Sequence, residues 1–377
     1  MEGRKLIMKV LVTGAQGFIG RNLIASLHYM DDIEVLAYEL NSSEEDLEKY
    51  TKEADFVFHL AGINRPKDES EFKKGNADLT QKLLDQLVKN NNPAPVLVTS
   101  SIQAERDNAY GQSKKLAEDY IFDYGKKNSV QVYVYRLSNV FGKWSRPNYN
   151  TVIATFCYNI ARGLPIQVND EKVVLNLMYI DDVVDEFIRA MQGEGNQDGE
   201  YYKVPVSYPR SLGEIVGLLE SFKSSRENRI IPNLSDDFTN KLYATYLNFL
   251  PEDQFSYPLL MHEDNRGSFT EFVKSPYAGQ ISINVSKPGI TKGDHWHHTK
   301  NEKFLVVSGT GVVKFRKLDS DKVIEYPVSG EELEVVDIPT GYTHSIVNTG
   351  ETDLVTVMWV NEMFDPNNPD TYPLEVE

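Results

Sequence analysis

The most restrictive feature of this chain is a glycine-rich turn between a short hydrophobic run and a helical pattern. Lys9–Thr13 has the β-branched composition of a buried strand, and helical spacing follows through about Tyr29. Gly14, Gly17 and Gly20 stand between the two. Glycines at such a place let the backbone turn tightly and approach a pyrophosphate at the N-terminus of the helix. The arrangement predicts a Rossmann-like, doubly wound parallel α/β sheet that binds a dinucleotide.

An acidic residue ends the second expected strand. Ile33–Tyr38 is predicted to be that strand, and Glu39 follows it about twenty residues after the glycines. An acidic side chain here usually binds the ribose hydroxyls of NAD and disfavours the 2′-phosphate of NADP. An ordinary glutamate at a strand end would look the same, so both interpretations stay open.

Three polar residues have the spacing of a carbonyl-reducing site. Val96–Ser101 is predicted to be a strand that ends in hydroxyl groups, and Tyr110 and Lys114 begin the next helix. Tyrosine and lysine four residues apart share a helix face. The ammonium group is expected to lower the pKa of the phenol, so that Tyr110 can exchange a proton with a carbonyl substrate. Ser101 is expected to hold the same carbonyl oxygen.

Residues 8–243 resemble the extended short-chain dehydrogenase/reductase family. Beside the glycine turn and the Tyr110/Lys114 pair, the matching runs are His59–Gly62 with Asn64, Arg136–Gly142, and Tyr179–Val183. The resemblance implies that Asn64 and Asn139 bind substrate. The residues implied to contact the nicotinamide cofactor are Gly14, Gln16, Gly17, Phe18, Ile19, Gly20, Glu39, Leu60, Ala61, Gly62 and Lys114.

One departure from this family concerns a loop length. Ser101 and Tyr110 are nine residues apart, whereas most extended members have a longer loop at this place. The sugar contacts of other members therefore do not transfer directly to this chain.

The second part of the chain has a different composition. From Pro251 onward, short alternating runs separated by turns predict an all-β sandwich or barrel. We expect a reductase domain over 8–245 and a β domain over 250–377, with a smaller cap and a linker within 190–250. Residues 1–7 precede a second methionine and are interpreted as a cloning remnant. One helix of the cap is expected to pack in the core through Phe238, Leu242, Tyr246 and Phe249.

Histidines gather in the β domain, where five of the seven follow residue 261. Side chains alternate along a strand, so His295 and His297 are expected on one side and Trp296 on the other. Glu302 and His344 can join the two histidines from neighbouring strands. Three imidazoles and one carboxylate suit a divalent ion such as Zn²⁺, held by three or all four of these side chains.

The spacing of these residues resembles the two motifs of the cupin family. The first motif, G-x5-H-x-H-x4-E-x6-G, matches from Gly289 to Gly309. The second, P-x-G-x2-H-x3-N, matches from Pro339 to Asn348, although Leu333 stands where a preceding glycine is usual. The resemblance implies a jelly-roll fold with a metal centre. An open sheet edge in such a domain is the basis for expecting a homodimer.

Composition excludes several partners. The net charge of −17 argues against nucleic acid and against anionic membrane surfaces. No apolar run reaches the length of a membrane span, and no secretory signal is present. The single cysteine, Cys157, cannot form an internal disulfide, which fits a reducing cytoplasm.

A reductase joined to a cupin resembles the CapF family of bifunctional capsular-polysaccharide enzymes, over almost the whole chain. The matching runs are Thr13–Gly20, Ser100–Ala104 and the histidine motif. The resemblance implies two steps on a UDP-linked 4-keto amino sugar, on the way to UDP-N-acetyl-L-fucosamine. The cupin half would epimerise C3, and the reductase half would use NADPH to reduce the C4 ketone to UDP-2-acetamido-2,6-dideoxy-L-talose. Glu39 favours NADH instead; we follow the resemblance and expect NADPH, with NADH as the alternative.

The proton-transferring residue of the epimerase is not identified by the sequence. The candidates are a histidine left off the metal, His295 or His298, together with Tyr342 and Lys303.

Three other interpretations compete with the bifunctional one. The cupin half could be only a binding or dimerising module beside a single reductase. A 4-epimerase or 4,6-dehydratase would use bound NAD without net redox change; dehydratases usually carry acidic residues where this chain has Ile102 and Gln103. A non-enzymatic NADP sensor is disfavoured by the intact Tyr110/Lys114 pair.

Overall fold

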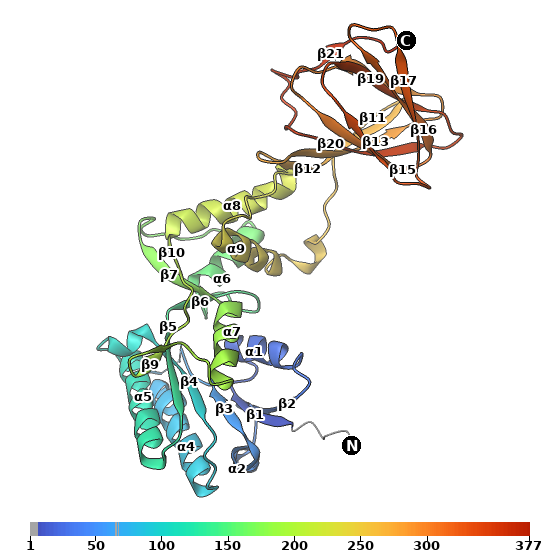
Figure 1. The fold of residues 1–377 in the computed structure, drawn as a ribbon. Helices are drawn as coiled ribbons and strands as arrows, with labels where there is room; N and C mark the ends of the chain where they lie inside the picture. Colours follow the sequence, from blue (N-terminus) through green and yellow to red (C-terminus); the bar gives the residue numbers. More distant parts are fainter. Residues whose placement is uncertain (1–6, 65, 67) are drawn as a thin grey trace, which may run out of the picture. The chain divides into compact units, whose positions relative to one another are not determined.

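The structure is a computed structural model that describes residues 7–64, 66 and 68–377. Its contacts divide the chain into two units (Figure 1). The first unit extends to Glu220 and includes Leu234–Pro251; the second comprises Ser221–Asn233 and Glu252–Glu377. The domain limits 8–245 and 250–377 stay a prediction. The division by contacts differs from them because it assigns Ser221–Asn233 to the second unit. Of residues 1–7, which we interpreted as a remnant, only Ile7 is among the described residues.

The first unit is built on a sheet with the strand order β2-β1-β3-β4-β5-β9-β8. The pairs from β2 to β9 are parallel, and only the last pair, β8 with β9, is antiparallel. β2 lies on one side of β1 and β3 on the other, so the order in which the chain adds strands reverses at this point. Open α/β sheets bind ligands at such a switch point. The strands are β1 (Met8–Thr13), β2 (Ile33–Tyr38), β3 (Phe56–His59), β4 (Val96–Ser101), β5 (Val132–Leu137), β8 (Gln197–Asp198) and β9 (Tyr201–Tyr202).

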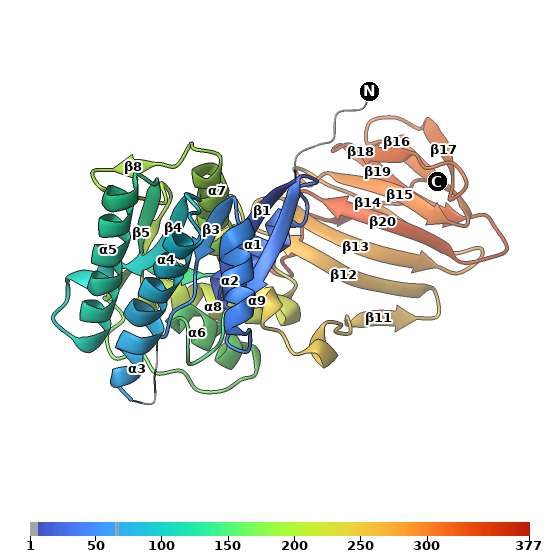
Figure 2. The same ribbon diagram turned by 90° about the horizontal axis from the view of Figure 1, so that it is seen from below.

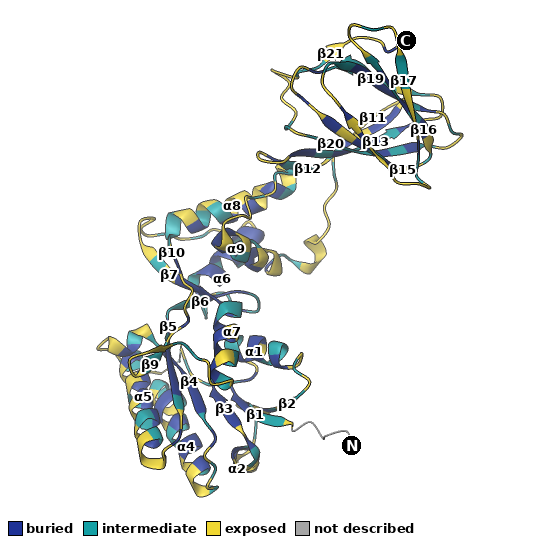
Figure 3. Cartoon of the chain, in the orientation of Figure 1, coloured by how far each residue is buried: buried dark blue, intermediate teal, exposed yellow. Residues whose placement is uncertain are grey.

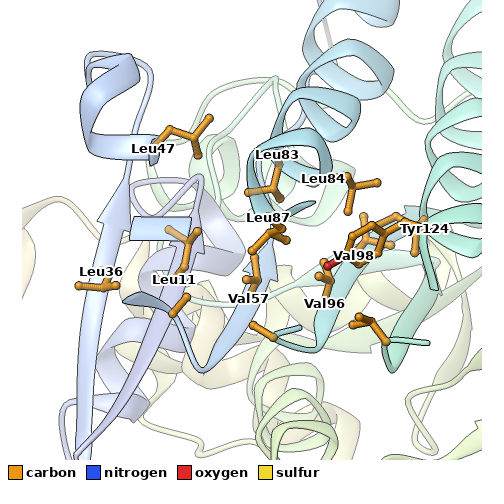
Figure 4. Packing of buried hydrophobic residues seen from close by; sticks show 14 of the residues in the cluster. Leu11, Leu36, Leu47, Val57, Leu83, Leu84, Leu87, Val96, Val98 and Tyr124 are labelled. Carbon is orange, nitrogen blue, oxygen red and sulfur yellow. The ribbon is translucent and has the colours of Figure 1, made fainter. Parts of the chain in front are cut away.

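Helices cover both faces of this sheet. On one face, buried side chains of β1, β3 and β4 pack against α2, α4 and α5, as Leu11, Leu47 and Leu83 show in Figure 4. On the other face, Phe187 of α7 stacks against Phe58 of β3 with ring centroids 6.3 Å apart. The central strands are therefore buried on both sides (Figure 3), as predicted for a doubly wound sheet. The helices are α1 (Phe18–Leu27), α2 (Glu44–Glu53), α3 (Ser70–Phe72), a π-helical turn (Lys73–Asp78), α4 (Leu79–Lys89), a 3₁₀ turn (Ile102–Glu105), α5 (Ala109–Asn128) and α7 (Ile180–Met191).

A smaller region completes the first unit. It contains a sheet of order β10-β7-β6 and the helices that follow these strands. The predicted core helix is confirmed, because Phe238, Leu242, Tyr246 and Phe249 are all buried. The elements are β6 (Asn139–Phe141), α6 (Val152–Ala161), β7 (Val174–Tyr179), β10 (Tyr208–Ser211), α8 (Leu212–Asn228, which continues into the second unit) and α9 (Asp237–Asn248).

The second unit is two antiparallel sheets, as predicted for an all-β domain. Their orders are β11-β12-β13-β20-β15-β18 and β17-β16-β19-β14-β21. Phe304 and Leu354 of the first sheet and Phe315 and Ile346 of the second share one hydrophobic core, so the sheets pack face to face. Figure 2 shows β11 at the outer edge, beside β12. After a 3₁₀ turn (Glu252–Gln254), the strands are β11 (Met261–Asp264), β12 (Gly267–Ser275), β13 (Gly279–Ser286), β14 (Thr291–Trp296), β15 (Glu302–Ser308), β16 (Thr310–Lys317), β17 (Val323–Ser329), β18 (Val335–Ile338), β19 (Tyr342–Asn348), β20 (Leu354–Val360) and β21 (Tyr372–Pro373).

Within the part of the chain that the structure describes, no helix combines the length and the hydrophobicity needed to cross a membrane.

Candidate active site and candidate metal centre

The glycine turn after β1 has no room for side chains. Gly14 has a φ of +68°, and a Cβ atom there would lie 2.8 Å from the Cα of Ala61. A Cβ atom on Gly20 would lie 2.3 Å from the carbonyl oxygen of Gly14. The turn can therefore close only with glycine at these positions, and it leaves the first turn of α1 exposed to a ligand.

A cavity of about 1040 Å³ lies at the carboxyl ends of the parallel strands in the first unit. Turns after β1, β3 and β4 form its walls, together with the start of α5. The cavity brings together every residue that the sequence predicted for cofactor binding, catalysis and substrate binding. These are Gly14, Gln16, Gly17, Phe18, Ile19, Gly20, Glu39, Leu60, Ala61, Gly62, Asn64, Ser101, Tyr110, Lys114 and Asn139.

Tyr110 lies at the start of α5, whose N-terminus is capped by the Asn108 side chain. Its hydroxyl donates a hydrogen bond to Oδ1 of Asn64, at 3.2 Å. Burial raises the pKa of the Tyr110 phenol, and the neighbouring Ser101 hydroxyl lowers it only in part. The expectation that Lys114 would lower this pKa is therefore wrong, because burial disfavours the charged phenolate and raises the pKa instead.

Lys114 is buried one helical turn further along α5. Its ammonium group donates to the carbonyl oxygen of Thr99 at 3.2 Å. Burial lowers the pKa of Lys114 to about 8, although Glu118 acts in the opposite direction. Gly62 leaves space for this ammonium group, since a Cβ there would lie 3.1 Å from Nζ.

A buried polar network lies behind the catalytic candidates. Glu118, on the next turn of α5, accepts a hydrogen bond from Ser100 at 2.6 Å. Arg136 of β5 binds the same carboxylate with two nitrogens, at 2.8 and 2.7 Å, and its guanidinium group lies 4.1 Å from the ring centre of Tyr201. The network fixes α5 against the ends of β4 and β5, and so fixes the place of Lys114.

Several residues of the cavity were missed by sequence reasoning. Arg146, Tyr149 and Asn150 enter it from the loop between β6 and α6, and Leu175 and Leu212 enter it from the smaller region. This loop directly follows the matched run that ends at Gly142, and it contains the cation Arg146. Both features could have indicated that the loop lines the cavity.

In the second unit, the four predicted metal ligands come together. One ligand atom of each of His295, His297, Glu302 and His344 lies within 4.8 Å of those of the others. His295 and His344 are paired residues of the neighbouring strands β14 and β19, while Glu302 begins β15 in the opposite sheet. Trp296 points the other way and stacks on Tyr372, which is the expected alternation.

The chemistry of this cluster fits a cation. His297, Glu302 and His344 are buried, yet Nε2 of His297, both ring nitrogens of His344 and Oε2 of Glu302 have no hydrogen-bond partner among the described residues. Buried polar atoms rarely stay unpaired, so an added ligand that accepts their lone pairs is the simplest completion. Burial lowers the pKa of His295 to about 4, which leaves its imidazole neutral and able to bind a metal.

The negative charge of Glu302 also suits a metal ligand. Burial alone would raise the pKa of this carboxyl group, but the adjacent imidazoles of His297 and His344 outweigh burial and hold the pKa well below its usual range. The carboxylate lies 3.8 Å from Nε2 of His297 and 3.4 Å from Nε2 of His344.

Asp370 supports the cluster through hydrogen bonds to His297 and to the segment that follows it. Its backbone carbonyl accepts a hydrogen bond from Nδ1 of His297 at 2.6 Å, which leaves Nε2 as the free lone pair. Its carboxylate accepts from the backbone N–H groups of His298, Thr299 and Lys300, at 3.0, 2.8 and 2.8 Å. Two residues later, β21 pairs with the end of β14. No pattern in the sequence indicated this support.

A second cavity, of about 300 Å³, opens beside the cluster and is lined by His295 and His344. Of the four candidate proton-transferring residues, His295 lies on it. The other three lie elsewhere: Lys303 pairs with Asp337, His298 packs against Tyr372, and Tyr342 packs against the hydrophobic core. The cavity adds residues that the sequence did not single out, namely His262, Asp264 and Lys292.

Family models match both parts of the chain. Residues 10–204 match the NAD dependent epimerase/dehydratase family, and residues 262–372 match the polysaccharide biosynthesis C-terminal domain.

Similar proteins extend over nearly the full length. The chain is 46% identical to a UDP-2-acetamido-2,6-beta-L-arabino-hexul-4-ose reductase from Pseudomonas aeruginosa, over 98% of this chain and 99% of that protein. A crystal structure of the capsular polysaccharide assembling protein CapF from Staphylococcus aureus has 54% identity and a TM-score of 0.92, covering 98% of this chain and 100% of that one.

A more distant structure shares only the fold of the first part. It is a UDP-glucuronic acid 4-epimerase from Bacillus cereus, 20% identical with a TM-score of 0.55, covering 64% of this chain and 99% of that one. The chain therefore belongs to the NAD dependent epimerase/dehydratase family and, over its whole length, to the CapF group of capsular-polysaccharide proteins.

Proposed function

We propose that this chain is a bifunctional nucleotide-sugar enzyme that supplies UDP-N-acetyl-L-fucosamine for capsular polysaccharide. Its β-rich unit would epimerise C3 of a UDP-4-keto-2-acetamido-2,6-dideoxyhexose. Its α/β unit would then reduce the C4 ketone, giving UDP-2-acetamido-2,6-dideoxy-L-talose. The observation that carries the proposal is the presence of two complete side-chain groups, one for carbonyl reduction and one for a metal, in a chain 46% identical to a UDP-sugar reductase.

The reduction depends on the three polar residues of the larger cavity. A bound nicotinamide coenzyme would supply a hydride to C4, held by the glycine turn and the residues that line the cavity around it. Tyr110 would donate its phenolic proton to the C4 oxygen, for which its hydroxyl must leave Asn64. Ser101 would hold that oxygen by a hydrogen bond. Lys114, when protonated, favours loss of the proton from Tyr110 because it stabilises the phenolate.

The epimerisation depends on the histidine cluster. His297, Glu302 and His344, with or without His295, would hold a divalent ion, for which Zn²⁺ suits the donor set. Such an ion would supply Lewis-acid polarisation of the C4 carbonyl, which acidifies the proton on C3. If three side chains suffice for the metal, the neutral His295 at the cavity wall is placed to take that proton and to return one.

A deuterium-exchange assay separates the two activities. A UDP-4-keto sugar is incubated in D₂O with and without reduced coenzyme, and C3 exchange and coenzyme oxidation are followed separately. His344→Ala should abolish C3 exchange and keep the reduction of an already epimerised ketone. Tyr110→Phe should keep C3 exchange and slow the reduction by about 10²- to 10⁴-fold.

Matched controls lie close to both residues. His298→Ala removes a neighbouring imidazole outside the cluster, and Tyr120→Phe removes a hydroxyl from the same helix as Tyr110. Both should leave both activities intact. Loss of the two activities together in either test variant, with normal folding, would contradict the division of labour.

A single-activity reductase is the second candidate. It is favoured by the name of the Pseudomonas aeruginosa relative, which mentions reduction alone. In that case the β-rich unit would bind or dimerise only, and the edge strand β11, all four residues of which are exposed, is the natural place for a homodimer. Reduction of the ketone without C3 exchange in the wild type, at the same rate in metal-free protein and in His344→Ala, would support this candidate. We propose a cytoplasmic site of action on the basis of the buried, unpaired Cys157.

A further inference from the structure

The cavity of the first unit has an acidic side chain where the coenzyme's adenosine end is expected. Glu39 follows β2 directly and lines the cavity together with Tyr38 and Leu40. Its carboxylate accepts a hydrogen bond from the backbone N–H of Gln16, inside the glycine turn. Its own backbone N–H donates to the hydroxyl of Ser42 at 2.9 Å. Glu39 is therefore held at the cavity wall from two sides and does not extend into solvent as an ordinary strand-end glutamate would.

This position decides what can occupy the adenosine ribose site. In strand–glycine turn–helix folds, the end of the second strand faces the 2′ and 3′ positions of that ribose. A carboxylate can accept hydrogen bonds from both hydroxyl groups of NADH. The 2′-phosphate of NADPH carries roughly two negative charges and would lie against the same carboxylate. Like charges repel strongly inside such a cavity.

Binding of that phosphate would require a cation nearby. Among the described residues, the cations that line the cavity are Lys114 and Arg146. Lys114 is engaged at the carbonyl of Thr99, at the end of β4, and Arg146 belongs to the loop after β6. The neighbours of Glu39 in the cavity wall, Tyr38 and Leu40, carry no charge, and the net charge of −17 gives no compensation at longer range.

We infer that this chain binds NADH in preference to NADPH and that Glu39 is the residue that sets this preference. The inference rests on the proposed reductase function, and it chooses against the NADPH that the resemblance implied.

Direct binding tests the inference without the sugar reaction. Purified full-length protein is titrated with NADH and with NADPH by calorimetry, and the two Kd values are compared. We expect NADH to bind at least about tenfold more tightly. Glu39→Gln removes the charge and keeps an acceptor for Gln16, and it should reduce the ratio to about threefold or less, mainly by tightening NADPH.

The matched control is Glu34→Gln, which makes the same change of charge on an exposed residue of β2 outside the cavity wall. It should leave the ratio unchanged. Equal or tighter binding of NADPH by the wild type, or an unchanged ratio in Glu39→Gln, would overturn the inference and leave the reductase proposal standing. Failure of both nucleotides to bind would overturn the reductase proposal as well.

Discussion

The larger cavity and the histidine cluster differ in how their polar groups are satisfied. In the cavity, the reactive groups are paired with protein atoms: Tyr110 with Asn64, Lys114 with the Thr99 carbonyl, and Glu39 with the N–H of Gln16. In the cluster, buried atoms of His297, Glu302 and His344 have no hydrogen-bond partner within the described part of the chain. The polar groups of the first site must therefore exchange partners to bind a ligand, whereas those of the second leave lone pairs available for the proposed ion.

Removal of the metal should produce the largest effect on stability. If an ion completes the cluster, a chelator should lower the free energy of unfolding of the second unit by about 4 kcal/mol, for a metal present at a thousand times its Kd. Coenzyme binding to the first unit should not change. The measurement is differential scanning calorimetry with and without added Zn²⁺. An unfolding temperature that neither chelator nor metal changes would show that no ion stabilises the cluster.

A smaller effect is expected from the network behind the cavity. Glu118→Gln leaves Arg136 without its buried partner and should lower the free energy of unfolding by about 3 kcal/mol, whether or not metal is present. Chemical denaturation of the metal-free and metal-loaded variant measures this. The exposed Asp119, on the same helix, offers the control Asp119→Asn, which should change stability by less than about 0.5 kcal/mol. A loss that depended on metal would show that the two sites are not independent.

The smallest expected effect concerns pH. Lys114 has a pKa of about 8, so its ammonium group is present below that pH and lost above it. If the charge assists Tyr110, kcat/KM for reduction should fall about tenfold per pH unit above pH 8. Lys114→Arg keeps its charge at all accessible pH values and should remove this fall. A pH profile that is the same in both proteins would show that the charge of Lys114 does not govern the reaction.

The fold and the membership of both sites could be predicted because each depends on short spacings. Gly14 and Gly20 occupy positions where no side chain fits, and His295 and His297 alternate along one strand. Such constraints act within a few residues and are visible in sequence. The doubly wound parallel sheet was expected from the same local pattern.

Features that depend on distant contacts or on solvent could not be predicted. Asp370 supports His297 across 73 positions of sequence, and no spacing rule connects them. The pKa of Tyr110 was predicted in the wrong direction because burial cannot be inferred from its spacing to Lys114. Arg146 enters the cavity through an irregular loop, for which periodicity carries no information.

The contact between Asp370 and His297 affects how the β-rich unit can be shortened or extended. A version that stopped after β20 would keep all four of the clustered side chains but lose the carbonyl that selects the tautomer of His297. It would also lose the short strand β21 beside β14. Shortened versions of the unit should therefore end beyond β21, so that the Asp370 carbonyl stays beside the imidazole ring of His297.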